Sequence, residues 1–137
     1  MSIDDAAPVR ELSAQLGYEA SLETTRTRIE QLTANRRNQA AFVAIVNGDV
    51  AGWIEVAINF HLQSDPHAVI GGLVVREDMR SQGIGRRLVA EAEKWSRKQG
   101  ITVLRVRSQI KREDAHRFYL REGFRQVKTS AVFEKSL

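Results

Sequence analysis

The chain has 137 residues and a formal net charge of +4, with 42% hydrophobic and 28% charged residues. This composition predicts one soluble domain over residues 1–137 and excludes a disordered tail, a collagen-like chain and a disulfide scaffold. The chain contains no cysteine, which excludes thiol catalysis and thiolate metal sites, and we expect no metal site. No apolar run is long enough for a membrane span and no secretory signal is visible, so we expect a cytoplasmic protein.

The charge is divided unevenly along the chain. Residues 1–75 carry five basic and nine acidic side chains, a net charge of −4, whereas residues 76–137 carry 16 basic and eight acidic ones, a net charge of +8. The second half is therefore expected to meet an anion. Nucleic acid is one alternative, but the basic residues are interleaved with Glu and Asp, and no known nucleic-acid module is present. A smaller polyphosphate ligand needs only a few of these cations.

Two helices and an apolar strand are predicted at the start of the chain. Asp4 and Asp5 can cap a helix that ends before Gly17, because apolar residues between them recur at helical spacing. Ser21 can begin a second helix. Residues 41–46 are continuously apolar and predict a buried strand.

Two further strands are predicted to follow. A turn at Asn47-Gly48-Asp49 leads into residues 50–62, where apolar and polar side chains alternate, and these residues are expected to form an antiparallel hairpin with the first strand. A turn around Ser64-Asp65-Pro66 then leads into a strand at 68–75. The Gly71-Gly72 pair is unusual inside a strand and suggests close approach by another backbone or a ligand.

The second half of the chain alternates helices and strands. A long helix is predicted from about 82 to 99 with Gly100 as its stop, followed by a strand at 101–107 and a helix at 113–122. One or two short strands are predicted within 124–136. The order predicts a mixed α/β layered domain, with a mostly antiparallel sheet of about six strands flanked by helices.

The most informative motif is the turn Arg80-Ser81-Gln82-Gly83-Ile84-Gly85-Arg86-Arg87, which lies between a predicted strand and a predicted helix. The first N–H groups of a helix have no intrahelical partner and favour anions. Glycines let a phosphate approach the peptide closely, and the three arginines add positive charge. A dinucleotide fingerprint would need Gly or Ala at Leu88, and a P-loop would need Gly-Lys-Ser/Thr, so neither matches. We predict a phosphate-binding turn; a glycine-rich connection without a ligand is the alternative.

Two motifs resemble the GNAT superfamily of acyl-CoA-dependent N-acetyltransferases. Arg80, Gly83 and Gly85 match the signature turn of the family in order, and residues 115–124 are similar to its second signature, Ala-x-x-Phe-Tyr-x-x-x-Gly-Phe. The resemblance covers about residues 5–137. It implies a GNAT-like fold and transfer of an acetyl group from acetyl-CoA to the primary amine of a small acceptor, by direct attack in a ternary complex. The acidic first half, which by the resemblance lines the acceptor side, favours a cationic amine such as a polyamine-like or aminoglycoside-like molecule, and the α-amino group of a protein or an amino acid is the alternative.

The resemblance also implies where CoA binds. Backbone N–H groups of residues 82–87 would hold the diphosphate, and a strand at 73–75 that splays from 103–107 would pair with the pantetheine arm. An N–H of Leu73 or Val74 would polarise the thioester carbonyl. The implied CoA contacts are Leu73, Val74, Val75, Arg80, Ser81, Gln82, Gly83, Ile84, Gly85, Arg86, Arg87, Arg112 and His116.

The resemblance implies one catalytic residue directly and leaves the general base to be inferred. Tyr119 stands where the family places a tyrosine that protonates or hydrogen-bonds the departing thiolate; a core tyrosine is the alternative. Many members carry a glutamate as general base at the position of Val69. Glu55, with His61 on the same strand face, is the substitute, and a solvent-facing strand position is the alternative.

The sequence also indicates residues of the acceptor pocket, an oligomeric state and two alternative functions. Tyr18 and Trp53 are expected to wall the acceptor pocket or to pack at its rim. Only Met1-Ser2-Ile3 precede the first helix, where the family usually has a strand, so the sheet edge at Phe42 is open and a homodimer is expected. A non-catalytic acyl-CoA-binding regulator and a basic nucleic-acid-binding module are the alternatives; we expect neither nucleic acid nor membrane as a partner.

Overall fold

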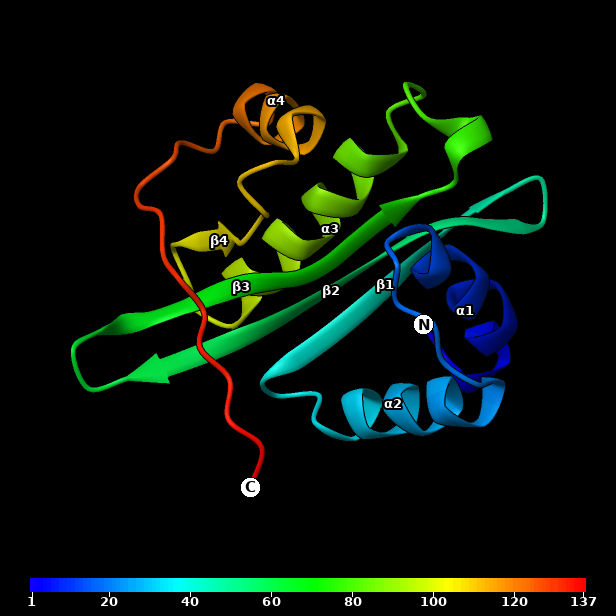
Figure 1. The fold of residues 1–137 in the computed structure, drawn as a ribbon, viewed down its shortest axis with the longest axis horizontal. Coiled ribbons are helices and arrows are strands. Elements are labelled where there is room, and N and C mark those ends of the chain that lie inside the picture. Colours follow the sequence, from blue (N-terminus) through cyan, green and yellow to red (C-terminus); the bar gives the residue numbers. More distant parts are fainter. The chain divides into compact units, whose positions relative to one another are not determined.

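A computed structural model describes residues 1–137 as two compact units, Met1–Arg107 and Ser108–Leu137. The first unit holds a four-stranded sheet and three α-helices (Figure 1). The second unit holds one helix, α4 (Glu113–Arg121), and a C-terminal segment without regular secondary structure. That residues 1–137 act as one domain remains a prediction.

The sheet has the strand order β1-β2-β3-β4. Its first three strands are antiparallel neighbours, and β4 runs parallel to β3. A two-residue turn joins β1 to β2, with Asn47 at φ +50° and Gly48 at φ +83°, which confirms the predicted hairpin. The strands are β1 (Gln39–Val46), β2 (Asp49–His61), β3 (Ser64–Val75) and β4 (Leu104–Val106).

The helices begin and end close to the predicted residues. A short 3-10 helix (Ile3–Asp5) precedes α1 (Ala6–Gln15), and the Ser21 hydroxyl accepts a hydrogen bond from the Thr24 N–H at 3.0 Å to cap α2 (Leu22–Ala34). Helix α3 (Ile84–Lys98) is followed by Gly100 at φ +77°, the predicted stop. None of the helices combines the length and the apolar character needed to cross a bilayer.

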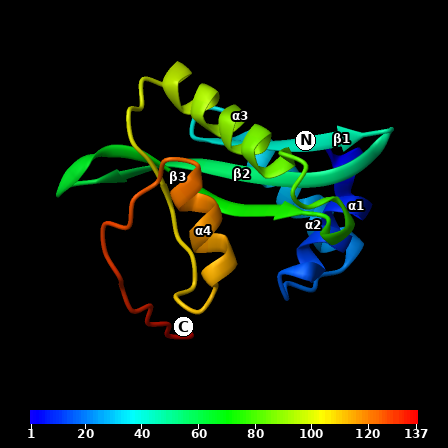
Figure 2. The ribbon, with the colours of Figure 1, turned by 90° about the horizontal axis from the view of Figure 1, so that it is seen from above.

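Helices cover both faces of the sheet in the first unit (Figure 2). Alternation along β2 decides which residues face which helix. Ile54 and Val56, which are 0% and 1% exposed, lie on the face that α3 covers. Trp53 points the other way and packs against the cluster formed by Ala6, Val9 and Ile29 from α1 and α2. We call the two faces of the sheet the α3 face and the α1/α2 face.

Three expectations about the strands were wrong. The β2–β3 connection lies at residues 62–63, so Asp65-Pro66 falls inside β3, where the proline is tolerated because β4 pairs only from Ala68 onward. The strand predicted at 101–107 is limited to residues 104–106. No strand forms within 124–136, because a strand needs a hydrogen-bonded neighbour and the sheet contains only β1 to β4. The predicted sheet of about six strands therefore has four.

Candidate functional site

One edge of β3 is left without a neighbouring strand. Strand β4 pairs with β3 only from Ala68 to Ile70, so residues 71–75 have no strand on that side, as expected for two diverging strands. We call residues 71–75 the free edge. Antiparallel pairs alternate between hydrogen-bonded and non-bonded residues. Because the Arg76 N–H donates to the Ala51 carbonyl at 2.8 Å, Val74 bonds to β2 whereas Leu73 and Val75 direct their backbone groups to the free edge.

This alternation shows which of the predicted CoA contacts at residues 73–75 have backbone groups that can reach a ligand. The N–H groups of Leu73 and Val75 face outward and suit an extended ligand that pairs with the strand. Of the two amides considered for the thioester carbonyl, Val74 is engaged with β2 and Leu73 is left. One outward carbonyl already has a partner, because the side-chain amide of Gln15, the last residue of α1, donates to the Val75 carbonyl at 3.1 Å. Sequence reasoning missed Gln15, since nothing local links two residues 60 positions apart.

The predicted phosphate turn follows directly after the free edge. Arg76 donates two hydrogen bonds to Asp78, at 3.2 and 2.9 Å, and this pairing lowers the pKa of the Asp78 carboxyl. Ser81 has φ +64°, and Gly83 has φ +78° and forms the N-cap of α3. The helix therefore begins at Ile84, two residues later than predicted, and the positive φ of Gly83 explains the glycine there.

The N-terminus of α3 provides N–H donors at this turn. The N–H groups of Ile84 and Gly85 have no intrahelical partner. The Arg87 N–H differs, because it donates to the Gly83 carbonyl at 3.1 Å, so the predicted series of amide donors from 82 to 87 stops before Arg87. The side chains of Arg80 and Arg87 are exposed, and no atom lies within 4 Å of the position that a Gly83 Cβ would take. The turn is open to an anion.

The glycine pair in β3 has a different explanation from the one expected. A Cβ on Gly71 would lie 2.7 Å from the Glu55 Oε1 atom, and a Cβ on Gly72 would lie 2.6 Å from the Trp53 ring. Both side chains reach across from β2, so the glycines make room for them rather than for a second backbone. The register also shifts at Gly71, which forms a β-bulge at the point where pairing with β4 ends.

Glu55 is therefore not a solvent-facing strand residue. Its carboxylate makes no hydrogen bond or ion pair in the structure, and burial raises its pKa. The neighbouring Trp53 Nε1–H is buried and also lacks a hydrogen-bond partner. A partly buried carboxylate with no cation beside the free edge is a ready acceptor for a proton or for an ammonium group.

Two other residues considered for the acceptor side lie apart from Glu55. His61 is six residues further along β2, roughly 20 Å away at strand spacing, and its ring stacks on His67 with a centroid distance of 5.6 Å. His61 therefore does not support Glu55 as a base. Tyr18 lies in the α1–α2 connection and is 65% exposed.

Within the second unit, Tyr119 lies in an aromatic cluster. Its ring makes edge contacts with Phe118 and Phe124, at centroid distances of 5.4 and 5.6 Å. Burial raises the Tyr119 pKa, and the positive charge of Arg112 opposes that effect only in part. Arg112 is the N-cap of α4, and the His116 Nε2 donates to the Gln109 carbonyl at 2.9 Å. Tyr119 thus stays a neutral phenol at physiological pH, and the His116 ring is already engaged.

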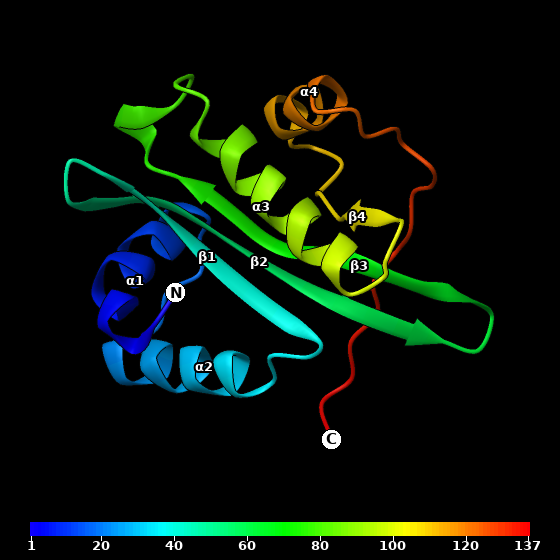
Figure 3. The same ribbon diagram turned by 180° about the vertical axis from the view of Figure 1, so that it is seen from behind.

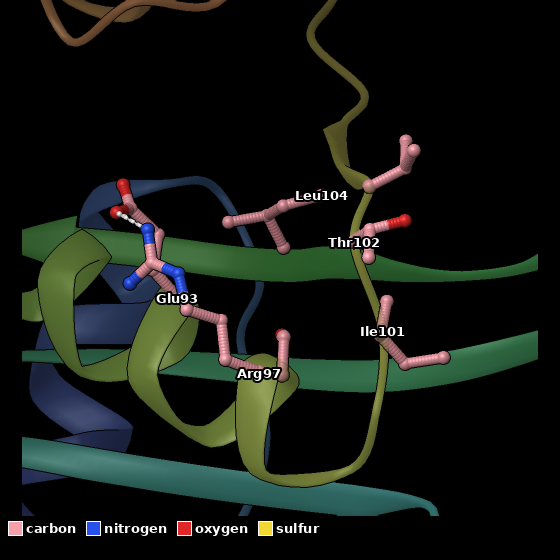
Figure 4. Close-up of a pocket in the computed structure, with 7 residues that line it drawn as sticks. Glu93, Arg97, Ile101, Thr102 and Leu104 are labelled. Atoms are coloured by element: carbon pink, nitrogen blue, oxygen red, sulfur yellow. Dashed lines mark hydrogen bonds and ion pairs between the residues drawn. The ribbon is translucent and has the colours of Figure 1, made fainter.

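Two cavities of the first unit are relevant to the site. The larger, of about 310 Å³, lies between the C-terminal half of α3 and the segment that leads to β4 (Figure 4). Its charged side chains pair with each other, since Arg97 donates to Glu93 at 3.4 Å, and it lies at the opposite end of α3 from Gly83. The smaller, of about 90 Å³, is bordered by Glu55 and Gly71.

Comparison with known proteins gives consistent results. The family model described as Acetyltransferase (GNAT) family matches residues 7–124. An aminoalkylphosphonate N-acetyltransferase of Salmonella typhimurium is 46% identical over 88 residues, which are 61% of this chain and 55% of that protein. An aminoglycoside N(6')-acetyltransferase type 1 of Serratia marcescens is 25% identical over 92% of this chain and 89% of that protein. The aminoglycoside N-acetyltransferase AAC(6')-Iy, solved in complex with CoA, aligns with a TM-score of 0.87 at 18% identity over 100% of this chain and 92% of that one.

Proposed function

The chain belongs to the acetyltransferase (GNAT) family. We propose that it is an acetyl-CoA-dependent N-acetyltransferase that acetylates the primary amine of a small, cationic acceptor, with Glu55 as the general base. The observation that carries the proposal is the partly buried Glu55 carboxylate, held without a cation over Gly71 beside the free edge of β3. The net charge of −4 in residues 1–75 supports a cationic acceptor. The names of the relatives, which specify aminoalkylphosphonate and aminoglycoside acceptors, support a small amine.

On the donor side, we assign the CoA diphosphate to the N-terminus of α3. The unpaired N–H groups of Ile84 and Gly85, the open space above Gly83 and the exposed Arg80 and Arg87 support this assignment. The pantetheine arm then follows the free edge of β3 and pairs with the outward N–H and carbonyl of Leu73 and with the outward N–H of Val75.

In the chemical step, the protonated amine first loses a proton to Glu55, because only the neutral amine has a lone pair for attack. The nitrogen then attacks the thioester carbon, the C–N bond forms and the C–S bond breaks, while the Leu73 N–H stabilises the carbonyl oxygen. The departing thiolate takes a proton from Tyr119, whose raised pKa keeps the phenol protonated. The new amide nitrogen then releases its second proton, which restores the Tyr119 phenol through water, and the proton held by Glu55 passes to solvent. The family motif that contains Tyr119 supports its role as the proton donor.

The diphosphate assignment is tested by Gly83→Ala, with Gly100→Ala as the matched control. The two glycines flank the same helix, have φ values of +78° and +77°, and have no atom within 4 Å of the position that a Cβ would take. Both variants lose about 1 kcal/mol of unfolding free energy from the positive φ. We expect only Gly83→Ala to weaken acetyl-CoA binding, by about tenfold or more in calorimetry. Equal affinity in the two variants would remove the diphosphate from this turn.

The role of Tyr119 is tested by Tyr119→Phe. We expect kcat to fall about tenfold to a hundredfold, while the Kd for acetyl-CoA changes less than twofold, because only the departing thiolate meets the phenol. Released free thiol, measured with a panel of primary amines, gives the rate. An unchanged kcat would make Tyr119 a packing residue, and release of no thiol with any amine in the wild-type protein would favour a non-catalytic acyl-CoA-binding regulator.

We also infer a cytoplasmic homodimer. The outer edge of β1 has no neighbouring strand in the sheet order, and the Met1 ammonium reaches only the Ala41 carbonyl at 3.3 Å. A second chain that covers this edge would satisfy its remaining backbone groups. Light scattering across a concentration series measures the oligomeric state, and a constant monomer mass would contradict the dimer.

A further inference from the structure

The small cavity beside Glu55 has a defined shape and chemistry. It measures about 90 Å³ and lies on the α1/α2 face between α2 and the first three strands, whose arrangement is visible from behind in Figure 3. We call it the Glu55 pocket. Its lining residues are Leu32, Gln39, Glu55, Val56, Ala57 and Gly71.

Small residues create the hollow. Ala57 pairs with Gln39 on β1 and with Val69 on β3, so its methyl group leaves space between longer neighbours on the same face. Gly71 adds no side chain at all. Leu32 of α2 is half-buried and borders the same space, so its size limits what the pocket can hold.

The two polar side chains of the Glu55 pocket both lack partners. Neither the Glu55 carboxylate nor the Gln39 side-chain amide makes an intramolecular hydrogen bond. An unpaired polar group in a partly buried position is costly, and a ligand that pairs with it regains that free energy. Glu55 suits an ammonium group, whereas the Gln39 amide can donate to or accept from a hydroxyl, ether or amide.

The volume limits the part of a ligand that fits inside the Glu55 pocket, which is partly open to solvent. A protein cavity of about 150 Å³ accommodates benzene, so about 90 Å³ holds roughly four non-hydrogen atoms. A nitrogen at Glu55 followed by two or three carbons fills that space and brings the next polar atom to Gln39. A branch on the carbon that bears the nitrogen would have to fit against Leu32, the bulkiest side chain that borders the pocket beside Glu55.

We propose that the Glu55 pocket binds the amine-bearing end of the acceptor and selects a primary amine on a short, unbranched chain with a hydrogen-bonding group two or three carbons away. This inference rests on the proposed acetyl transfer to an amine, and it adds the structure of the acceptor. One methyl group in a closely fitting pocket changes kcat/KM by about tenfold to 200-fold.

The test compares two isomers, 3-amino-1-propanol and 2-amino-1-propanol. The first carries its amine on an unbranched carbon with three carbons between nitrogen and oxygen. The second carries it on a branched carbon with two carbons between them, and both separations lie within the proposed range. We expect kcat/KM to be at least tenfold higher for 3-amino-1-propanol in the wild-type protein. Leu32→Ala should reduce that ratio to less than threefold by making space for the branch. Gln31→Ala, at the exposed neighbouring position of α2, is the control and keeps the wild-type ratio.

Two outcomes overturn the proposal: equal kcat/KM values for the isomers in the wild-type protein, or an unchanged ratio in Leu32→Ala. If no amine is acetylated, the proposed function fails. The pocket is then tested separately by measuring whether it binds an amine. We then expect 3-amino-1-propanol to shift the backbone amide NMR signals of Ala57 and Gly71 in the wild-type protein but not in Leu32→Trp, which fills the pocket. Absence of these shifts in the wild-type protein overturns the pocket as well.

Discussion

The two faces of the sheet differ in what their side chains do, although one strand supplies both. On the α3 face, β2 places Ile54 and Val56, which are almost fully buried and purely apolar. On the α1/α2 face, the same strand places Trp53 and Glu55, whose polar atoms lack partners. Because successive side chains of a strand point to opposite faces, β2 directs its packing residues to one face and the side chains that can contact a substrate to the other.

The largest expected effect tests the packing face alone. Ile54→Ala removes three carbons from a side chain with no solvent exposure and should lower the unfolding free energy by about 2–5 kcal/mol. Urea unfolding measures the loss. Because Ile54 points away from Glu55, kcat per folded molecule should change less than twofold. A hundredfold loss of kcat in folded protein would show that the two faces are not separate in function.

The next effect tests the other face. Glu55→Gln should lower kcat/KM for acetyl transfer by about a hundredfold, because the amide cannot accept the proton of the ammonium group. Glu30→Gln, an exposed carboxylate on α2, is the control with unchanged kcat/KM. Steady-state kinetics at pH 7 measure kcat/KM for both variants. Equal activity of the two variants would mean that another group accepts the proton.

The same variant has an opposite effect on stability. Burial raises the Glu55 pKa, so the folded state binds the proton more tightly than the unfolded state. The stabilising contribution of the carboxyl is therefore complete below about pH 4.3, its ordinary pKa, and is lost as the pH rises through the folded pKa. Glu55→Gln should be more stable than wild type at pH 7 and no more stable at pH 4, as measured by urea unfolding. A gain of equal size at both pH values would contradict the burial.

The smallest effects come from two glycines on opposite faces. A Cβ on Gly52 would lie 2.6 Å from the Val74 carbonyl oxygen, which belongs to the backbone, so Gly52→Ala should cost about 1–3 kcal/mol of unfolding free energy. A Cβ on Gly71 meets the end of the Glu55 side chain, which can rotate away. Gly71→Ala should therefore cost little stability but lower kcat/KM about tenfold. The reverse pattern would contradict the division of roles between the faces.

Much of the fold could be predicted from the sequence because its signals are local. Ser21, the Asn47-Gly48 turn and Gly100 mark ends that depend only on nearby residues, and all three lie where the structure places such ends. The apolar residues within 124–136 predict strands that do not form. A strand depends on a neighbour elsewhere in the chain, and no local pattern reveals whether that neighbour exists.

The candidate site divides in the same way. The glycine turn before α3 could be predicted because glycines and arginines stand together in one short segment, and its role in binding phosphate stays a prediction. The alternation along β2 places Glu55 on the correct face, but the bulge at Gly71 depends on the register between two strands and is not visible in the sequence. The hydrogen bond from Gln15 to the Val75 carbonyl joins residues 60 positions apart and has no local signal.

The overlap between the Glu55 carboxylate and the empty side-chain position of Gly71 has an evolutionary consequence. An acidic residue at position 71 would put its Cβ atom only 2.7 Å from the Glu55 Oε1 atom, so carboxylates at positions 55 and 71 could not both keep their places without a shift. A lineage can move the acid from one strand to the other by two linked substitutions. A sequence alignment of such proteins compares position 55 only with position 55, so it would report the base as absent. The carboxylate would nevertheless lie at the same place in the fold.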